Sequence, residues 1–338
     1  MKAVAYKVPG SIDSEESLID VVLEKPKASG RDLLVKVEAV SVNPVDTKLR
    51  RARPPFEGDE YAVLGFDASG VIEEIGGSVE NFKVGDQVFY AGSLVRPGTN
   101  SEFHLVDERI VGRKPSSISD SEAAALPLTA LTAWEMLFDR LMVDRPRAEG
   151  GDIVLIIGGA GGVGSIAIQL LRALTDLTVI ATASRPETEA WARECGAHHV
   201  INHREPLPEQ IIALGLRAPE FVFSTTQTDQ HLEGIAELIA PQGRFGLIDD
   251  PSDLSIMPFK RKSVSIHWEF MFTRSLFGTS DIEEQSRILN EVAKLVDEGK
   301  IRSTATEVAG RINAETLRAV HAKIESGTSR GKTVLAGF

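Results

Sequence analysis

A glycine-rich segment between an aliphatic run and an amphipathic stretch constrains the fold of this chain more than any other feature. Residues Ile153–Ile157 form a continuous aliphatic run, which is typical of a strand buried on both faces of a parallel sheet. After the glycine-rich residues Gly158–Gly164, apolar residues recur at helical spacing as far as Leu174. The order strand, glycine turn, helix predicts the first unit of a doubly wound α/β domain.

Three of these glycines, Gly159, Gly161 and Gly164, fit the pattern G-x-G-x-x-G. The first permits a tight turn, the second lets backbone amides approach a pyrophosphate, and the third lets the helix pack closely on the strand. We therefore predict a dinucleotide site formed by Gly159, Ala160, Gly161, Gly162, Val163 and Gly164. The alternative is a glycine-rich turn that only packs closely. A Walker loop is excluded, because Ser165 rather than lysine follows Gly164.

The end of the next predicted strand, Thr178–Ala183, indicates which dinucleotide is preferred. An acidic side chain about 20 residues after the glycines would bind the ribose 2′-hydroxyl of NAD. Ser184 and Arg185 stand there instead, and the first acid is Glu187. A hydroxyl and a forked guanidinium suit a 2′-phosphate, so we predict NADPH with Ser184 and Arg185 as phosphate ligands. In the alternative, Ser184 only caps the next helix together with Glu187, and Arg185 is solvated.

The strand and helix patterns also predict the domain boundaries. Four further β runs follow the glycine segment, separated by helical stretches: His199–Ile201, Phe221–Ser224, Phe245–Ile248 and Ser263–Phe272. Before about residue 111 the apolar runs are short and separated by turn glycines, which predicts a compact, mostly antiparallel β domain. We expect a β-rich domain over residues 1–125, completed by residues 273–338, and a Rossmann domain over residues 126–272.

Charge and cysteine content exclude several classes of protein. The chain has 37 basic and 49 acidic residues, a formal net charge of −12, so bulk binding to nucleic acid is not expected. The single cysteine, Cys195, cannot form an internal disulfide or a multi-cysteine zinc site, which favours a reducing compartment. No secretory signal is visible and no apolar run approaches the ~20 residues that span a bilayer. We expect a cytoplasmic protein without a membrane partner.

The segment around the glycine turn, Gly151-Asp152…Ala160–Gly164…Gln169…Arg172, resembles the signature of the quinone oxidoreductase/zeta-crystallin group of the medium-chain dehydrogenase/reductase superfamily. Gly159 departs from that signature, which usually carries Ser or Ala there. Other similar segments are Asn43–Asp46, Leu64–Gly70, Val84–Val88, Leu128–Trp134 and Gly331-Lys332. The bacterial zinc-type alcohol dehydrogenase-like branch is the most similar, through Ala181–Glu187, Gly196–His203 and His267–Arg274.

This resemblance implies a GroES-like β domain, a Rossmann domain, an active site between them, and a homodimer paired through the last Rossmann strand. It also implies where a catalytic zinc would bind. The Cys, His and Cys ligands of zinc-dependent relatives fall on Asn43, on Phe66 and near Ala125. Asn is a poor zinc ligand, and Phe and Ala cannot bind zinc. The four-cysteine structural lobe is also missing, so we predict no metal site.

Loss of the metal changes the expected reaction. Alcohol oxidation would lose its main electrostatic support, whereas a quinone or enone carries its own activating carbonyl. We predict an NADPH-dependent, zinc-independent oxidoreductase that reduces quinones or other α,β-unsaturated carbonyls by hydride transfer. One alternative is a zinc-dependent alcohol dehydrogenase, disfavoured by Asn43 and Phe66. The other is a non-catalytic NADPH-binding sensor or structural protein.

The catalytic candidates are two donors to the developing oxyanion, Asn43 and Tyr61. Asn43 stands where relatives bind metal beside the nicotinamide, so it is also a coenzyme contact; the alternative is a structural turn Asn before Pro44. Tyr61 follows a polar loop where relatives carry a substrate-facing Tyr. Asp46 is expected to hydrogen-bond its loop, and Asp67 is a candidate buried anchor. The remaining coenzyme contacts implied by the resemblance are Thr129, Thr132, His203, Thr225, Thr226 and Lys332, with packing or capping as the alternative for both helix threonines and a hinge contact for Lys332.

Overall fold

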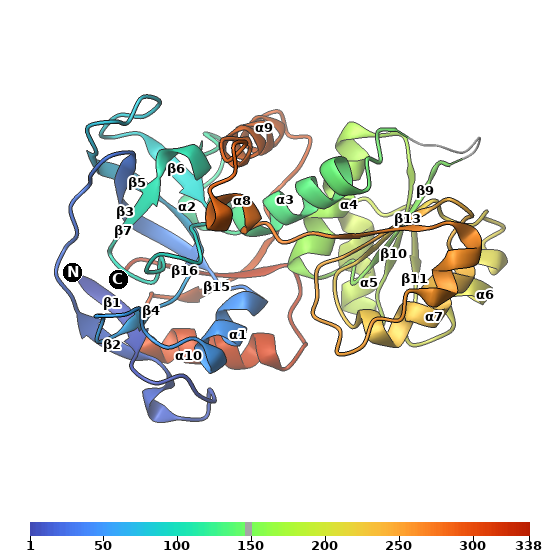
Figure 1. The fold of residues 1–338 in the computed structure, drawn as a ribbon, viewed down its shortest axis with the longest axis horizontal. Helices are drawn as coiled ribbons and strands as arrows, with labels where there is room; N and C mark the ends of the chain where they lie inside the picture. The colour runs from blue at the N-terminus through green and yellow to red at the C-terminus, as the bar shows by residue number, and fades with distance from the viewer. Residues whose placement is uncertain (146–150) are drawn as a thin grey trace. The chain divides into compact units, whose positions relative to one another are not determined.

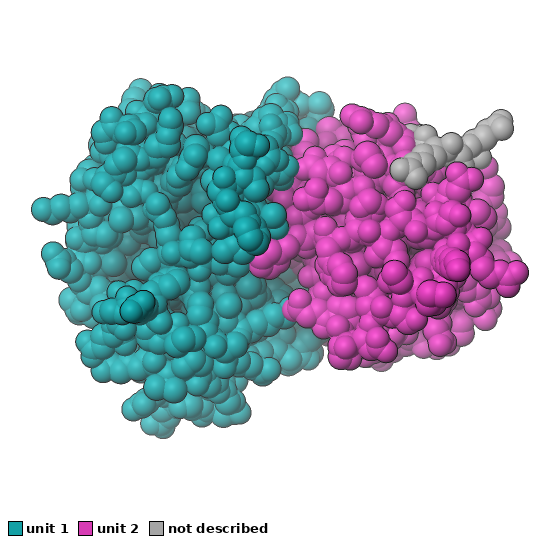
Figure 2. All heavy atoms as spheres, in the orientation of Figure 1, with its two compact units in different colours: residues 1–131, 272–338 teal, residues 132–271 magenta. Residues whose placement is uncertain are grey.

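A computed structural model describes residues 1–145 and 151–338 and divides the chain into two compact units (Figures 1 and 2). Unit 1 comprises Met1–Leu131 and Phe272–Phe338, and unit 2 comprises Thr132–Met271. The predicted first boundary lies earlier, at residue 125. The first turn of helix α3 (Pro127–Trp134) accounts for the difference, because the Leu128 N–H donates to the Asp67 carboxylate of unit 1 at 2.7 Å.

Unit 2 contains a six-stranded parallel sheet with the order β11-β10-β9-β12-β13-β14, which confirms the predicted α/β fold. The strands are β9 (Ile153–Ile157), β10 (Thr178–Thr182), β11 (His199–Ile201), β12 (Phe221–Ser224), β13 (Arg244–Leu247) and β14 (Ser265–Trp268). All five residues of β9 are buried, as its aliphatic run predicts. The chain passes from β9 to β10 and β11 on one side and then returns to β12 on the other. This reversal beside β9 is the topological switch point at which open α/β sheets bind ligands.

Helices surround the strands of this sheet in Figure 1. They are η3 (Glu135–Arg140), α4 (Gly162–Leu174), α5 (Pro186–Glu194), α6 (Leu207–Ala213), α7 (Thr228–Leu238) and η4 (Met257–Lys262). The predicted cap of α5 is wrong, because Arg185 rather than Ser184 occupies the N-cap position. The Arg185 N–H donates to Thr188 Oγ1 at 3.2 Å, and that hydroxyl donates back to the Arg185 carbonyl at 2.8 Å. Ser184 is therefore not needed to start the helix.

Unit 1 contains a seven-stranded sheet and a three-stranded sheet of order β2-β1-β4. The strands are β1 (Lys2–Tyr6), β2 (Ile19–Val22), β3 (Asp32–Ser41), β4 (Ala62–Val63), β5 (Asp67–Ile75), β6 (Gln87–Tyr90), β7 (Phe103–Asp107), β8 (Val111–Arg113), β15 (Ala305–Gly310) and β16 (Lys332–Ala336). The larger sheet has the order β15-β16-β3-β5-β6-β8, and β7 also pairs with β3. Because β16 pairs with β3, the C-terminal strand belongs to the same sheet as the N-terminal part of the unit.

The helices of unit 1 include α1 (Pro44–Ala52) and α10 (Ala314–Glu325). The others are η1 (Glu15–Ser17), η2 (Glu108–Ile110), α2 (Asp120–Ala124), α8 (Thr273–Phe277) and α9 (Glu284–Asp297). Pro44 at the first turn of α1 is a helix-start signal. Asn313 caps α10 through its side chain, which accepts from the Thr316 N–H at 2.8 Å.

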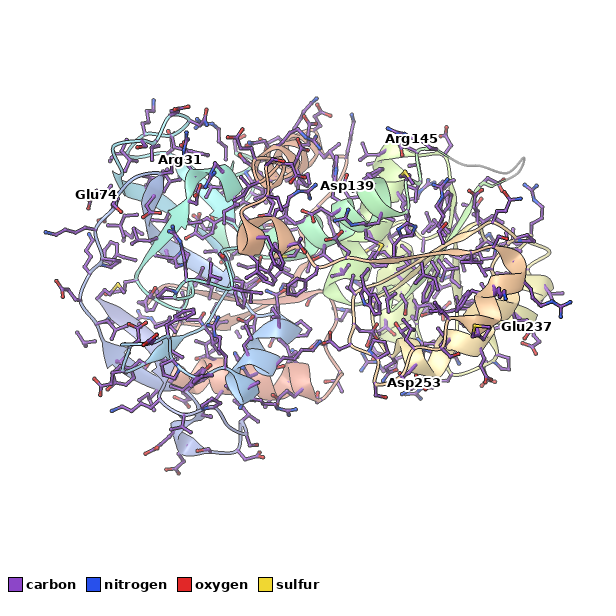
Figure 3. The ribbon with its side chains drawn as sticks, viewed as in Figure 1. Arg31, Glu74, Asp139, Arg145, Glu237 and Asp253 are labelled. Atoms are coloured by element: carbon purple, nitrogen blue, oxygen red, sulfur yellow. The ribbon has the colours of Figure 1, made fainter. Side chains whose placement is uncertain are left out.

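The acidic excess includes exposed carboxylates such as Glu74, Glu237 and Asp253, which lie at the periphery in Figure 3. Such side chains remain solvated and contribute little to folding. Within residues 1–145 and 151–338, no helix combines the length and apolar character that crossing a bilayer requires.

Strand β14 ends the order of its sheet, so one of its sides has no neighbouring strand among the described residues. Trp268, its last residue, is 56% exposed. An open edge of this kind favours pairing with a second chain.

We expect a dimer paired along β14. Trp268→Glu should convert it to a monomer in size-exclusion chromatography with light scattering, because the new charge would be buried at the interface. Phe277→Glu, on exposed α8, is the control; a wild-type monomer at every concentration would contradict the proposal.

Candidate active site

The glycine loop begins where β9 ends and is attached to β10 by hydrogen bonds. The Gly158 N–H donates to Thr182 Oγ1 at 3.0 Å, and the Gly159 N–H donates to the Thr182 carbonyl at 3.1 Å. Gly158 has a φ of 82°, a left-handed value that favours glycine. These contacts hold the turn at the carboxyl end of the sheet, directly before helix α4.

Two glycines of this loop have different surroundings. A Cβ on Gly164 would lie 2.3 Å from the Gly158 carbonyl oxygen and 2.7 Å from Gly159 Cα, so close packing there requires glycine. A Cβ on Gly161 would have only the Gly158 oxygen within 4 Å, at the ordinary contact distance of 3.4 Å, so a side chain can be accommodated there. Gly161 is the N-cap of α4, and no side chain caps that helix. Backbone amides at an uncapped helix start can bind a phosphate, so the loop fits the pyrophosphate of NAD(P)H.

Thr225 and Thr226 pack against the same turn. A Cβ on Gly158 would lie 2.4 Å from Thr225 Oγ1 and 3.1 Å from Thr226 Cγ2. The Thr225 hydroxyl donates to the Ile157 carbonyl at 2.8 Å, which fixes its orientation at the end of β9. The structure thus brings these two predicted coenzyme contacts to the glycine loop, and their contact with a coenzyme stays a prediction.

Basic side chains gather after β10 and β11. Arg185 Nε lies 3.1 Å from Glu187 Oε1, with the arginine side chain 32% exposed and the glutamate 56% exposed, so this ion pair is weak. The rings of His203 and His231 meet edge to face with centroids 6.2 Å apart. Burial and the nearby charges of His231, Arg204 and Arg185 lower the pKa of His203. Arg185 and Arg204 are therefore the positively charged side chains beside these two histidines, and a contact of Arg185 or His203 with a coenzyme stays a prediction.

The two helix threonines, Thr129 and Thr132, are both buried. Thr129 is buried, and its hydroxyl donates to the Leu126 carbonyl of its own helix at 3.1 Å. This bond agrees with the packing alternative for Thr129. Thr132 is also buried, 5% exposed, and begins unit 2. A coenzyme contact of either residue stays a prediction.

A buried polar cluster in unit 1 is centred on Asp67, which confirms its expected role as an anchor. Asp67 is completely buried and faces Ser41 across strands β3 and β5. Its Oδ1 accepts from the Leu128 N–H at 2.7 Å. Its Oδ2 accepts from Ser41 Oγ and from Asn43 Nδ2, each at 2.8 Å, and from Lys332 Nζ at 3.2 Å. Four donors therefore stabilise this carboxylate in the core.

Lys332 is the cation of this cluster. The register that pairs Val334 with Ser41, and the Val42 N–H with the Thr333 carbonyl, places Lys332 opposite Asn43. Lys332 Nζ donates to the Val42 carbonyl at 2.9 Å, to Asn43 Oδ1 and to Asp67 Oδ2. Burial lowers the pKa of this ammonium. Its three protons already have three acceptors, so a coenzyme contact would require one of these bonds to break.

The side chain of Asn43 bonds this cluster instead of capping helix α1. Asn43 is the N-cap of α1, yet its side chain makes no capping bond. Instead, Asp46 Oδ2 accepts from the Asn43 N–H at 2.7 Å, and Asp46 Oδ1 accepts from the Gly65 N–H at 3.1 Å. Asp46 thus bonds its loop as expected, and burial raises its pKa to about 7. The Asn43 amide is left to join Asp67 and Lys332.

The surroundings of Asn43 do not fit a zinc ion. Phe66, at the position of the histidine ligand, is 1% exposed and packs edge to face on Phe272 with ring centroids 4.8 Å apart. The Asn43 oxygen, the remaining ligand atom, accepts from an ammonium that would repel a metal cation. In the part of the chain that the structure describes, no three His, Cys, Asp or Glu side chains form a group that could hold a metal.

Tyr61 contacts a different part of unit 1 from this cluster. It is partly buried directly before β4 and packs on a small apolar group that contains Ala3, Ala5 and Val63. Lys7 Nζ lies 4.9 Å from the centre of its ring. Among the described residues, these contacts link Tyr61 to β1 rather than to Asn43, and its catalytic role stays a prediction.

Three residues that lie in these sites are not predicted from the sequence: Ser41, His231 and Arg204. Ser41 ends β3 and His231 lies in the first turn of α7, and neither belongs to a short motif. Arg204 directly follows His203 and could have been selected for its charge alone. The strand and helix packing that brings them together is not visible in local sequence.

Comparisons with known proteins identify the family. The family model "Zinc-binding dehydrogenase" matches residues 195–335, and "Alcohol dehydrogenase GroES-like domain" matches residues 29–116. A zinc-type alcohol dehydrogenase-like protein of Staphylococcus epidermidis is 39% identical over 99% of both chains. The chain belongs to the medium-chain dehydrogenase/reductase superfamily. Within the superfamily it belongs to the zinc-type alcohol dehydrogenase-like branch, as the sequence motifs predict.

Solved structures of this superfamily match the whole chain. A putative zinc-dependent alcohol dehydrogenase from Rhizobium etli is 60% identical with a TM-score of 0.98, covering 100% of this chain and 98% of the other. The quinone oxidoreductase from Coxiella burnetii is 27% identical with a TM-score of 0.80, covering 100% and 99%. A human mitochondrial NAD(P)H oxidoreductase is 30% identical, over 90% of this chain and 81% of its own. The protein is therefore an oxidoreductase of the medium-chain superfamily with a GroES-like β domain and a Rossmann-type sheet.

Proposed function

We propose that this medium-chain oxidoreductase uses NADPH to reduce quinones or other α,β-unsaturated carbonyls by hydride transfer, without zinc. The observation that carries the proposal is the environment of Asn43. The Lys332 ammonium donates to the amide oxygen of Asn43, and Phe66, at the position of the histidine ligand, packs on Phe272. These residues do not fit the Lewis acid that alcohol oxidation needs. An activated carbonyl requires mainly positioning and a hydrogen-bond donor.

Each part of the site has a separate task in this proposal. The N–H groups at the start of α4 hold the pyrophosphate, while Thr225 and Thr226 support the turn that presents them. When bound, NADPH supplies the hydride. Asn43 donates to the carbonyl oxygen that gains negative charge, and water supplies the final proton. The quinone oxidoreductase of Coxiella and the human NAD(P)H oxidoreductase support this class of reaction by their names.

The proposed reaction is tested by the loss of NADPH absorbance with a panel of quinones and enones, with and without a metal chelator. We expect turnover that the chelator does not change. Activity lost on chelation and restored by zinc would overturn the metal-free mechanism. NADPH binding without turnover of any carbonyl would instead favour a non-catalytic sensor or structural protein.

The preference for NADPH over NADH is tested at Arg185. Arg185→Ala should weaken NADPH binding about 30-fold and NADH binding less than about threefold, because a charge-assisted bond to the 2′-phosphate is lost. Glu187→Gln should strengthen NADPH binding, because the carboxylate that pairs with Arg185 is removed. Fluorescence titration with both coenzymes measures the effect.

Arg193→Ala is the matched control for this experiment. Arg193 lies on the same helix, α5, and forms an exposed ion pair with Glu189 at 2.9 Å. Its loss should leave both dissociation constants unchanged. Equal weakening of NADPH and NADH by Arg185→Ala would remove the proposed 2′-phosphate role.

A further inference from the structure

The buried contacts of Asn43 fix the orientation of its amide. An ammonium can only donate and a carboxylate can only accept, so the amide oxygen must face Lys332 and the nitrogen must face Asp67. One of the two Nδ2 protons bonds Asp67 Oδ2 at 2.8 Å, which leaves the second proton for a ligand. Asn43 is 1% exposed, so these bonds are shielded from bulk water.

The two charged partners have different effects on the amide. Lys332 stabilises negative charge on Oδ1 and so strengthens the remaining N–H as a donor, whereas Asp67 accepts the other Nδ2 proton and fixes the orientation of the amide. Lys332 also offsets the negative charge of Asp67, 3.2 Å from its ammonium. Without this cation, an uncompensated carboxylate would stand beside any oxyanion bound at Asn43 and oppose it.

We propose that Lys332 is a positioning residue that acts through Asn43, polarising its amide so that the free N–H stabilises the oxyanion of the substrate. This inference rests on the proposed function. Hydride adds to the β-carbon of the enone, the C=C electrons shift to the carbonyl oxygen, and water protonates the resulting enolate. The substrate gains two electrons, the dihydronicotinamide is oxidised, and the N–H of Asn43 bonds the oxygen throughout. A buried ammonium thus serves a site whose residues do not fit zinc.

A double-mutant cycle tests this coupling. Lys332→Met should lower kcat for enone or quinone reduction about 10- to 100-fold, the effect of one charge-assisted hydrogen bond, and change the dissociation constant of NADPH less than twofold. In an Asn43→Ala background the same substitution should change kcat less than threefold, because the amide through which it acts is absent. Additive losses, or a loss confined to NADPH affinity, would overturn the proposal.

Two further variants keep the test independent of folding. Lys332→Met leaves Asp67 buried without its cation, so Lys332→Met/Asp67→Asn removes both charges together; it should fold and still show the reduced kcat. Full recovery of kcat in this neutral pair would contradict polarisation by Lys332. Lys323→Met, an exposed lysine of α10, is the control and should retain wild-type kcat.

A spectroscopic measurement separates this inference from the proposed reaction. In selectively ¹⁵N-asparagine-labelled wild-type protein, the Asn43 side-chain protons should resonate downfield of the other asparagines, and Lys332→Met/Asp67→Asn should move them upfield. A wild-type protein inactive on every carbonyl but with this shift would contradict only the reaction. An active protein with an ordinary Asn43 resonance would contradict only the role of Lys332.

Discussion

Gly161→Asp is expected to weaken NADPH binding on the order of 100-fold while leaving the free energy of unfolding unchanged or slightly higher. Gly161 is the N-cap of α4 with a φ of −72°, which any residue can adopt, and a Cβ there would overlap no atom. Aspartate is a favourable N-cap, so the substitution should not destabilise helix α4. The same carboxylate would accept hydrogen bonds from the backbone amides that would otherwise bind the pyrophosphate. It would also repel the negative charge of the pyrophosphate.

Gly161→Asn separates charge from size in this experiment. Asparagine has nearly the same shape and also caps helices well, but it is neutral. We expect an intermediate loss of NADPH affinity, so the difference between the two variants measures repulsion of the phosphates. Binding of NADPH to Gly161→Asp with wild-type affinity would show that the coenzyme does not use this helix start.

Gly164→Ala provides the contrasting substitution within the same loop. Its Cβ would overlap backbone atoms of Gly158 and Gly159, which cannot move aside like a flexible side chain. We expect a loss of about 3 kcal/mol in unfolding free energy, measured by urea denaturation. Gly161→Asp would thus weaken NADPH binding, whereas Gly164→Ala would lower the free energy of unfolding.

Much of unit 2 could be predicted because its signals are local. Strand β9, the glycine loop and α4 follow one another within Ile153–Leu174, and each has its own pattern of residues. The predicted sixth strand, Ser263–Phe272, is shorter in the structure, where β14 covers Ser265–Trp268. Pro127 begins α3 soon after α2 ends, and Ser119 caps α2 with Glu122. Local chemistry determines these features.

The cluster around Asn43 could not be derived in the same way. Lys332 is 289 residues from Asn43, and the two meet only because β16 pairs with β3 in one particular register. A shift of one residue would turn every side chain of β16 to the other face. The resemblance to the family selects both residues, but their hydrogen bond depends on a long-range pairing that spacing does not show.

The cap of α5 shows how local chemistry can also mislead. Ser184 and Glu187 have the spacing of a capping box, but Thr188 provides the hydroxyl that bonds the Arg185 N–H. The helix therefore begins one residue later than the pattern indicates. This shift leaves the Ser184 hydroxyl outside the cap, directly after β10.

His321→Leu is expected to reduce the pH dependence of the free energy of unfolding. His321 is completely buried on α10, and neither ring nitrogen has a hydrogen-bond partner among the described residues. Burial lowers its pKa from 6.5 to about 3, with a smaller effect from Arg50. Between these values the unfolded chain binds a proton that the folded protein does not. Stability is therefore full above about pH 6.5 and falls as the pH decreases towards 3.

The magnitude follows from the two pKa values. At pH 5, 1.5 units below the unfolded pKa, His321 lowers the unfolding free energy by about 2 kcal/mol relative to pH 8. His104, whose pKa burial lowers to about 4, has the same sign. Asp46 has the opposite sign, because its raised pKa of about 7 makes the folded protein bind the extra proton. The difference between wild type and variant isolates His321, since the other two groups contribute equally to both.

Urea denaturation at pH 8 and pH 5 measures this difference. At pH 8 we expect His321→Leu to be more stable than wild type by about 1 kcal/mol, because two unpaired ring nitrogens leave the core. At pH 5 the advantage should grow to about 3 kcal/mol. His199→Gln, on the edge strand β11, is the control and should follow the wild-type curve. Equal differences at both pH values would mean that His321 takes up its proton in the folded protein, and that a partner such as a buried water satisfies its ring.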